Sequence, residues 1–156
     1  MQERNNLLIT RVEELLEVER KFHSLFHVNP VPAWLKFITQ DGQLVMGMVN
    51  TAYTNLTGIS VNAYAGRKDK DIWTVGEATE FLETEKLILK TGIPKRIIER
   101  AINLRTGHPQ YWLGWKWPCV HQGEVIGIWG QAEPYPEEFW KRSGEEILTA
   151  LKEYYP

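Results

Sequence analysis

The chain has 156 residues, of which 43% are hydrophobic and 24% are charged, a composition typical of one soluble globular domain. The formal net charge is −2, and the densest basic cluster, residues 67–71, is interleaved with acids, so we expect no nucleic-acid partner. No apolar run approaches the roughly 20 residues that cross a bilayer, and the first residues do not resemble a secretion signal. We therefore expect a cytoplasmic protein without membrane contact.

Hydrophobic periodicity and turn signals predict the elements of the chain. Pro30 and Pro32 end the first helix, because proline removes a backbone donor, and Asp41-Gly42 between two apolar runs indicates a hairpin. Pro134 and Pro136 are predicted to close the sheet. In chain order we expect a helix over 6–27, strands over 33–39 and 43–48, a short helix over 50–58, a largely irregular segment over 60–76 with one or two helical turns, a helix over 77–90, strands over 96–104, 111–120 and 124–132, and a helix over 137–155.

This order of elements, together with several local patterns, resembles the PAS domains. The patterns are Asp41-Gly42 followed by residues 49–58, the stretch 66–73, the stretch 88–94, and the glycine-rich run 123–130. The resemblance covers residues 24–135 and implies an α+β fold, with a five-stranded antiparallel sheet and a helical middle segment. It divides the chain into an N-terminal amphipathic helix over 1–28, a PAS core over 29–135 and a C-terminal helix over 136–156.

The PAS resemblance also implies a cavity between the inner face of the sheet and the helical middle segment, where a small molecule would bind. Strand alternation places Trp112, Gly114 and Lys116 on one face, and register with the family assigns that face inward. The predicted ligand-binding residues are Trp34, Asn50, Tyr53, Trp73, Ile88, Trp112, Lys116 and Ile128. The inward Gly114 and Gly130 would leave room for a ligand, whereas the large inward aromatic side chains would fill it.

An inward ammonium group at Lys116 is costly unless it is paired, so we expect a carboxylate partner, Asp71 or Glu99, or an anionic ligand. The alternative is that Lys116 reaches solvent or a purely structural ion pair. Two interpretations also stay open for Asn50 and Tyr53. They either contact a ligand, or Asn50 caps a helix and Tyr53 fills the core.

The opposite face of the sheet is predicted to carry an aromatic patch too large to leave in water. The N-terminal helix is the expected cover, from the same chain or, as the PAS resemblance implies, from a second chain. The residues predicted for helix packing or dimerisation are Leu8, Val12, Leu15, Phe22, Trp115, Trp117 and Trp129. We therefore expect a homodimer.

No nucleophile is paired with a base and no two carboxylates are placed for catalysis, so no catalytic residue is predicted and an enzyme is not expected. His23 and His27 have the spacing of a metal pair, but no third ligand is evident, so no metal site is predicted. Within the PAS resemblance, residues 77–90 lack the histidine that haem would need. Cys119, the single cysteine, lies too late in the chain for covalent flavin photochemistry. The identity of any cofactor is otherwise open.

Two functions remain open at this point. The first is a PAS sensor domain in signal transduction or transcriptional regulation, which binds a small molecule in its cavity, dimerises to relay a signal, or does both. The second is a ligand-free protein–protein interaction or dimerisation module. Either one is compatible with a signalling partner protein.

Overall fold

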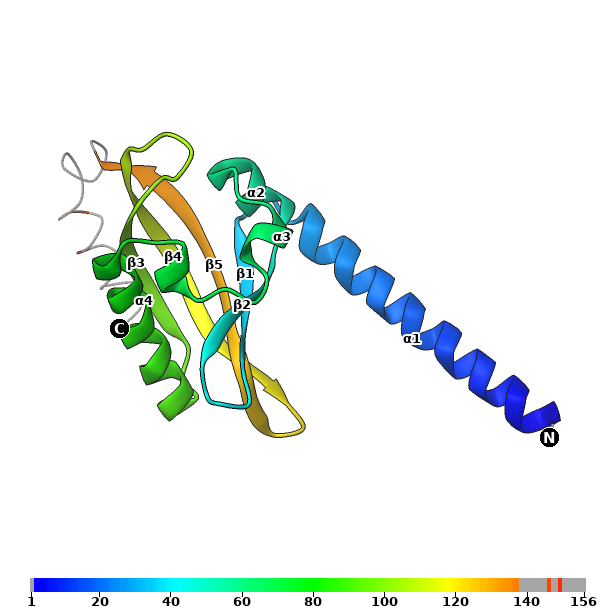
Figure 1. The fold of residues 1–156 in the computed structure, drawn as a ribbon. Coiled ribbons are helices and arrows are strands. Elements are labelled where there is room, and N and C mark those ends of the chain that lie inside the picture. Colours follow the sequence, from blue (N-terminus) through cyan, green and yellow to red (C-terminus); the bar gives the residue numbers. More distant parts are fainter. Residues whose placement is uncertain (1, 138–145, 147–148, 150–156) are drawn as a thin grey trace.

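The computed structural model describes residues 2–137, 146 and 149 (Figure 1). Its elements are α1 (Gln2–Val28), β1 (Ala33–Ile38), β2 (Leu44–Val49), α2 (Thr51–Thr57), α3 (Val61–Tyr64), the 3-10 helix η1 (Asp69–Asp71), α4 (Val75–Thr91), β3 (Lys95–Ile102), β4 (Pro109–His121) and β5 (Glu124–Pro136). The predicted α+β class is confirmed. The predicted C-terminal helix lies almost entirely outside the described residues, and the division of the chain at 28 and 135 stays a prediction.

The five strands form one antiparallel sheet in the order β2-β1-β5-β4-β3. The expectation that prolines close the sheet is confirmed for Pro136, where β5 ends, whereas Pro134 lies within β5 and pairs with Trp112 of β4. The pairing of β5 with β1 stops at Gln131, opposite Ala33. Beyond that point β5 has a neighbour strand on one side only, and proline is tolerated where a strand has a free edge.

Local capping signals determine where the long helix α4 begins and ends. α4 starts before the predicted residue 77, because Thr74 and Glu77 form a capping box over its first turn. Glu77 also accepts a hydrogen bond from the backbone N–H of Ile102 at 2.6 Å, which ties the start of α4 to the end of β3. α4 ends at Gly92, whose φ of 67° is the left-handed conformation that glycine favours at a helix C-terminus.

The helical middle segment and α4 cover one face of the sheet, and α1 extends away from the domain (Figure 1). We call the covered face the inner face and the opposite one the outer face. The core lies on the inner face, where Trp34, Tyr53, Tyr64 and Trp112 are all buried. Among the described residues, no helix is both long enough and apolar enough to cross a membrane.

Candidate functional site

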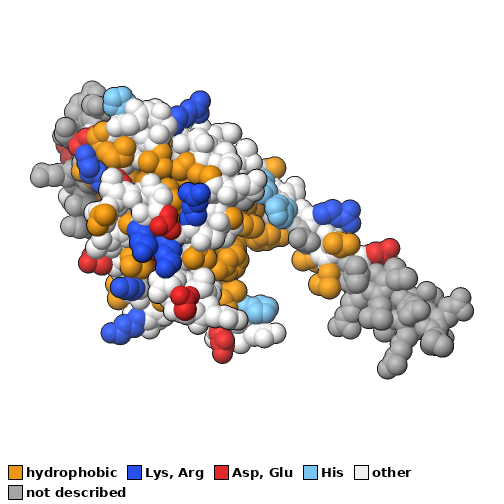
Figure 2. Space-filling view, in the orientation of Figure 1, with side chains coloured by type: hydrophobic (Ala, Val, Ile, Leu, Met, Phe, Trp, Pro, Cys, Tyr) orange, Lys and Arg blue, Asp and Glu red, His pale blue; other side chains and the backbone are white. Residues whose placement is uncertain are grey.

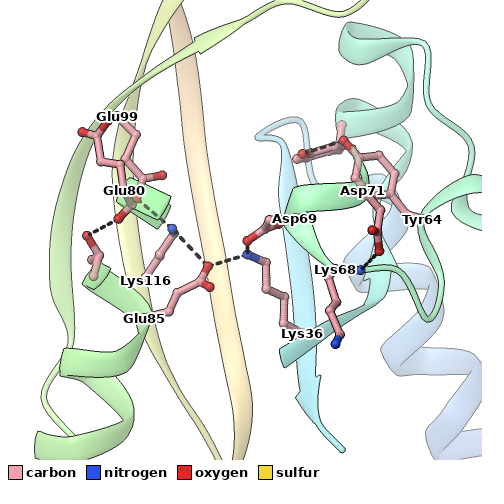
Figure 3. Close-up of polar contacts among 11 residues, drawn as sticks. Lys36, Tyr64, Lys68, Asp69, Asp71, Glu80, Glu85, Glu99 and Lys116 are labelled. Carbon is pink, nitrogen blue, oxygen red and sulfur yellow. Dashed lines mark hydrogen bonds and ion pairs between the residues drawn. The ribbon is translucent and has the colours of Figure 1, made fainter. Parts of the chain in front are cut away.

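Five charged side chains meet beneath the helices of the inner face, and we call them the buried charge cluster: Asp69, Lys36, Glu85, Lys116 and Glu99 (Figure 3). Lys36 Nζ donates to Asp69 and lies 2.5 Å from Glu85 Oε1. Lys116 Nζ lies 3.1 Å from the same Glu85 oxygen and 2.7 Å from Glu99 Oε1. Carboxylate and ammonium groups therefore alternate along the cluster, with a carboxylate at each end.

The members of the buried charge cluster come from five different elements. Asp69 belongs to η1, Lys36 to β1, Glu85 to α4, Lys116 to β4 and Glu99 to β3. Strand alternation puts Lys36 on the same face as Trp34, and Lys116 on the same face as Trp112. The cluster thus joins the helical middle segment, both halves of the sheet and the long helix α4 through a single series of ion pairs.

Because these groups are buried, the charged form of each is stabilised by its ion-pair partners and not by bulk water. Lys116 is 1% exposed and Glu85 is fully buried, so neither is solvated by water. Burial alone would lower the pKa of Lys36, but the carboxylates of Glu85 and Asp69 outweigh it and raise that pKa. Burial alone would raise the pKa of Glu85, but Lys36 and Lys116 on either side hold it below its usual value. At the end of the cluster, burial raises the pKa of Glu99 and Lys116 only partly opposes it.

A cavity of about 30 Å³ lies beside the buried charge cluster. Its wall includes the rings of Trp34, Tyr53 and Trp112 and the charged ends of Lys116 and Glu99. A space of this size is far below the roughly 300–1,000 Å³ of a typical small-molecule pocket. A small-molecule ligand therefore requires one of the cavity walls to move.

The aromatic wall of the cavity leaves one polar group without a partner. The ring of Tyr53 stacks on Trp112 with centroids 6.0 Å apart and meets Trp34 edge-on at 5.8 Å. The Tyr53 hydroxyl is 3.1 Å from that of Tyr64, and burial raises the pKa of Tyr53, so both hydroxyls stay protonated. Trp112 Nε1 and Glu85 Oε2 are buried without a hydrogen-bond partner in the part of the chain that the structure describes. An unpaired buried indole N–H is unfavourable, and it marks a position where an acceptor would fit.

Of the eight predicted ligand-binding residues, Trp34, Tyr53, Trp73, Trp112 and Lys116 line this cavity. Their role in binding a ligand stays a prediction. Ile88 and Ile128 are fully buried but do not form its wall.

Asn50 does not form the cavity wall either, because its side chain is used within the fold. Its Oδ1 accepts from the N–H groups of Ala33 and Tyr53, both at 3.0 Å. Its Nδ2 donates to the carbonyls of Val31 and Asn29. The predicted helix-capping role of Asn50 is therefore confirmed, and its contact with a ligand stays a prediction.

The expectation that inward glycines leave room for a ligand is wrong. A Cβ at Gly130 would collide with the indole of Trp34, and a Cβ at Gly114 would collide with the backbone of Gln131. The space above Gly130 is thus already filled by Trp34, and that beside Gly114 by the neighbouring strand. These glycines permit close packing of the sheet, and the cavity lies elsewhere on the inner face.

The inward orientation of Lys116 and its pairing with Glu99 are confirmed, whereas the proposed alternative partner Asp71 is wrong. Asp71 instead accepts a hydrogen bond from the backbone N–H of Lys68 and caps η1. Sequence reasoning missed Lys36 and Glu85. Lys36 follows Trp34 by two residues in a strand, so the same alternation places it inward. Glu85 lies four residues after Phe81 and three before Ile88, on the buried stripe of α4.

On the outer face, α1 of the same chain covers part of the predicted aromatic patch. Trp129 stands opposite Trp117 in the sheet, and its ring lies 5.8 Å from Phe22 and 5.9 Å from Phe26. Trp115 is 38% exposed. Leu15 faces solvent, and the side chains of residues 8 and 12 lie outside the described ones. Figure 2 shows apolar side chains on the part of α1 nearest the domain and where the helix joins it.

No family model and no curated protein matches this chain, but solved structures do. VqmA of Vibrio cholerae, in a complex with ligand and DNA, is 23% identical over 73% of this chain and 50% of its own, with a TM-score of 0.61. An RNA-binding light-oxygen-voltage receptor is 16% identical over 86% of this chain and 38% of its own, with a TM-score of 0.67. The PAS domain of an HTR-like protein from Haloarcula marismortui is 14% identical over 81% and 98%, with a TM-score of 0.62.

These similarities confirm that the chain has the PAS fold. The chain spans about half the length of the VqmA chains that it matches.

The expectation that nucleic acid is excluded as a partner is wrong. Two structures with this fold are described as a complex with DNA and as an RNA-binding receptor. Net charge bears only on phosphate contacts made by this surface itself, whereas the PAS fold occurs within larger chains that are described as engaging nucleic acid. The net charge of −2 is therefore no basis for that exclusion.

Proposed function

We propose that this chain is a PAS sensor domain that binds a small molecule in the cavity beside the buried charge cluster and relays the event to α1 and to a second copy of the chain. The observation that carries this proposal is the combination of buried charges and the unpaired Trp112 N–H at the wall of one cavity. A fold that needs only to pack gains little from buried ion pairs, because apolar side chains of similar volume often stabilise a core as well or better. A ligand that forms hydrogen bonds or ion pairs with these groups would explain why the fold keeps them buried.

Binding in this cavity requires a wall to open, and the helical middle segment is the wall best suited to move. α3 and η1 are short elements of four and three residues, whereas the opposite wall belongs to strands of one five-stranded sheet. An outward shift of η1 moves Asp69 away from Lys36. Lys36 then depends on Glu85 alone, so opening the cavity alters the charge balance at α4.

The route from the cavity to α1 runs through β5. Trp34 lines the cavity and its indole packs over Gly130 of β5, whose neighbour Trp129 faces outward against Phe22 and Phe26. A ligand that displaces the Trp34 ring therefore changes how β5, and with it Trp129, packs against α1. Because α1 exposes apolar side chains such as Leu25, which is 72% exposed, a change in its angle alters the surface offered to a second copy.

Two comparisons support the proposal. A VqmA chain that is 23% identical is described as bound to DPO, so a chain with this fold accommodates a ligand. The Vibrio cholerae VqmA is described as a dimer that undergoes a large conformational shift. Both statements concern VqmA, and we extend to this chain only the general scheme of a ligand and a dimer.

Native mass spectrometry of the purified chain, before and after unfolding, tests this function. We expect an additional small-molecule mass that is present in the folded protein and lost on unfolding. Trp112→Phe keeps the ring but removes the unpaired N–H, so it should weaken retention of that mass. Trp115→Phe, on the outer face, is the matched control and should retain it. A folded wild-type protein that carries no such mass and gains none from an extract of small molecules would contradict the sensor proposal.

The second candidate is a ligand-free interaction module, and the size of the cavity favours it. At about 30 Å³ the cavity is nearly filled by its own aromatic side chains. Leu15, Leu25 and Val28 of α1 are each more than half exposed, which suits assembly with a partner helix. A dimer whose dissociation constant is unaffected by every small molecule tested would support this candidate.

A further inference from the structure

The charges beside the cavity do not balance. Three carboxylates, of Asp69, Glu85 and Glu99, share the two ammonium groups of Lys36 and Lys116. Glu85 contacts both ammonium groups, whereas Glu99 contacts only Lys116, which also contacts Glu85. Glu99 is also the one of these two glutamates that lines the cavity. The cavity wall itself carries two ammonium groups, of Lys36 and Lys116, and two carboxylates, of Asp69 and Glu99, so each positive charge that a ligand could meet there is already paired.

We propose that this cavity selects a small planar ligand that is uncharged or cationic, with an N–H donor for Glu99 beside an acceptor for Trp112 Nε1, and that it rejects carboxylates and phosphates. The inference rests on the proposed function, because it concerns the same cavity. It argues against one of the alternatives from sequence, in which Lys116 binds an anionic ligand.

The geometry of β3 and β4 places the two recognition groups side by side. Glu99 and Trp112 are directly opposite each other in the antiparallel ladder, and both side chains are buried on the inner face. Side chains opposite each other in such a pair start about 5 Å apart. The indole N–H only donates and the ionised carboxylate only accepts, so the matching ligand edge carries an acceptor and a donor on adjacent atoms. Amides and lactams have such an edge.

An anion would meet no free positive charge in this cavity. Both ammonium groups are already within ion-pair distance of two carboxylates each. To bind an anion, Lys116 would have to leave Glu99 or Glu85, and a buried carboxylate would lose its partner. A cation instead gains Glu99 and the faces of the aromatic wall, which includes Trp34 and Tyr53. Burial raises the pKa of Glu99, which agrees with a carboxylate that is short of positive charge.

The test uses three probes of one shape and different charge: benzamide, benzamidine and benzoate. Each is titrated into the full chain labelled with ¹⁵N, and the indole N–H resonance of Trp112, assigned by its loss in Trp112→Phe, reports binding. We expect benzamide and benzamidine to bind at least about tenfold more tightly than benzoate, because juxtaposed like charges disfavour the anion. Glu99→Gln should reduce the ratio of benzamidine to benzoate affinity by about tenfold. Glu83→Gln, at an exposed position of α4, should leave it unchanged.

The outcomes separate this inference from the proposed function. Benzoate binding as tightly as benzamide would overturn the charge selection and leave a ligand-binding domain in place. An unchanged probe ratio in a folded Glu99→Gln variant would remove Glu99 as the selecting group and overturn the inference. If no probe shifts the Trp112 resonance at millimolar concentration, the proposed ligand edge is wrong, and native mass spectrometry alone then decides whether the domain binds a ligand.

Discussion

The two faces of the sheet expose and bury side chains in opposite ways. On the inner face, charged groups are buried, and Lys36 and Lys116 each have two carboxylate partners within the same chain. On the outer face and along α1, apolar groups such as Leu25 are exposed and only partly covered by the chain itself. The inner face therefore pairs its two lysines within one chain, while the outer face is where we propose that a second copy packs. Changes to the inner face should alter folding, and changes to the outer side should alter assembly.

The largest effect is expected from Lys116→Met on the inner face. The substitution leaves Glu99 buried without an ammonium group and removes one of the two that stabilise Glu85. Removing one partner of a buried ion pair typically costs about 3–5 kcal/mol of unfolding free energy. Urea denaturation at neutral pH measures it, with Lys86→Met at an exposed position of α4 as the control.

A second substitution shows whether charge is the cause of that loss. In the double variant Lys116→Met with Glu99→Gln, the unpaired carboxylate is gone, so part of the lost stability should return. If the double variant is as unstable as the sum of the two single variants, lost packing of the lysine stem explains the result and the charge cluster does not.

A smaller loss is expected from Gly130→Ala, which tests the packing beneath the cavity. The added Cβ collides with the indole of Trp34, so the ring must move into the space that now forms the cavity. Overpacking of this kind costs about 1–3 kcal/mol. Gly76→Ala, where a Cβ meets nothing within 4 Å, is the matched control. A Gly130→Ala protein with the stability and the tryptophan fluorescence of the wild type would show that the Trp34 ring accommodates the added Cβ without a cost in free energy.

Much of the fold could be predicted because its signals are local. Proline and glycine positions, strand alternation and the Asp41-Gly42 turn are enough to place the strands of the hairpin and to put Trp112 and Lys116 on one face, which register with the PAS family then assigned inward. Where the local signal was incomplete, the observed boundary of an element differs from the predicted one. α4 begins earlier than its apolar stripe suggests, because the side chain of Thr74 caps it.

The site was harder to predict because it depends on contacts between distant elements. That Lys116 needs a carboxylate follows from burial, but the central role of Glu85 follows only when α4 lies across the sheet. The volume of the cavity likewise depends on how the ring of Trp34 occupies the space above Gly130. Alternation could have found Lys36, but no sequence pattern could have paired it with Asp69, which is 33 residues away.

The pH dependence of stability gives a smaller test of the inner face. Burial raises the pKa of Glu99 above its ordinary 4.5, despite the opposing effects of Lys116 and, more weakly, Lys36. The folded state then holds this proton more tightly than the unfolded state, so the contribution of Glu99 falls as pH rises from 4.5 through the folded pKa. The Glu99→Gln variant has no such carboxyl group to ionise. Its free energy of unfolding relative to the wild type should therefore increase as pH rises from 4.5 through the folded pKa of Glu99.

Denaturation of both proteins across a pH series measures this difference. Glu85, whose pKa is lowered by Lys36 and Lys116, favours the folded state above its unfolded pKa, and this contribution is lost as pH falls through its folded pKa. Because Glu85 is present in both proteins, its effect largely cancels in the comparison. A difference that stays flat with pH would mean that the carboxyl of Glu99 is ionised as readily in the folded as in the unfolded state.

The smallest effect on folding, and the most direct test of the outer side, is expected from Leu25→Glu in α1. Leu25 is 72% exposed, so the unfolding free energy of the monomer should change by no more than about 0.5 kcal/mol. If α1 packs against a second copy, the new charge should weaken the dimer strongly, as analytical ultracentrifugation would show. Leu82→Glu, at an exposed apolar position of α4, is the control and should leave the dimer intact. A Leu25→Glu protein that dimerises like the wild type would place the interface elsewhere.

The same variant shows whether the two faces are coupled, because it changes assembly without touching the cavity. Linkage is reciprocal: if a ligand changes the dimer dissociation constant by some factor, dimerisation changes the ligand's dissociation constant by the same factor. The Leu25→Glu monomer should therefore differ from the wild-type dimer in its affinity for benzamide by the factor that benzamide exerts on dimerisation. Equal affinities together with a ligand-sensitive dimer would violate this relation. Equal affinities, together with a dimer whose dissociation constant does not depend on the ligand, would mean that the buried charge cluster and the outer face act independently.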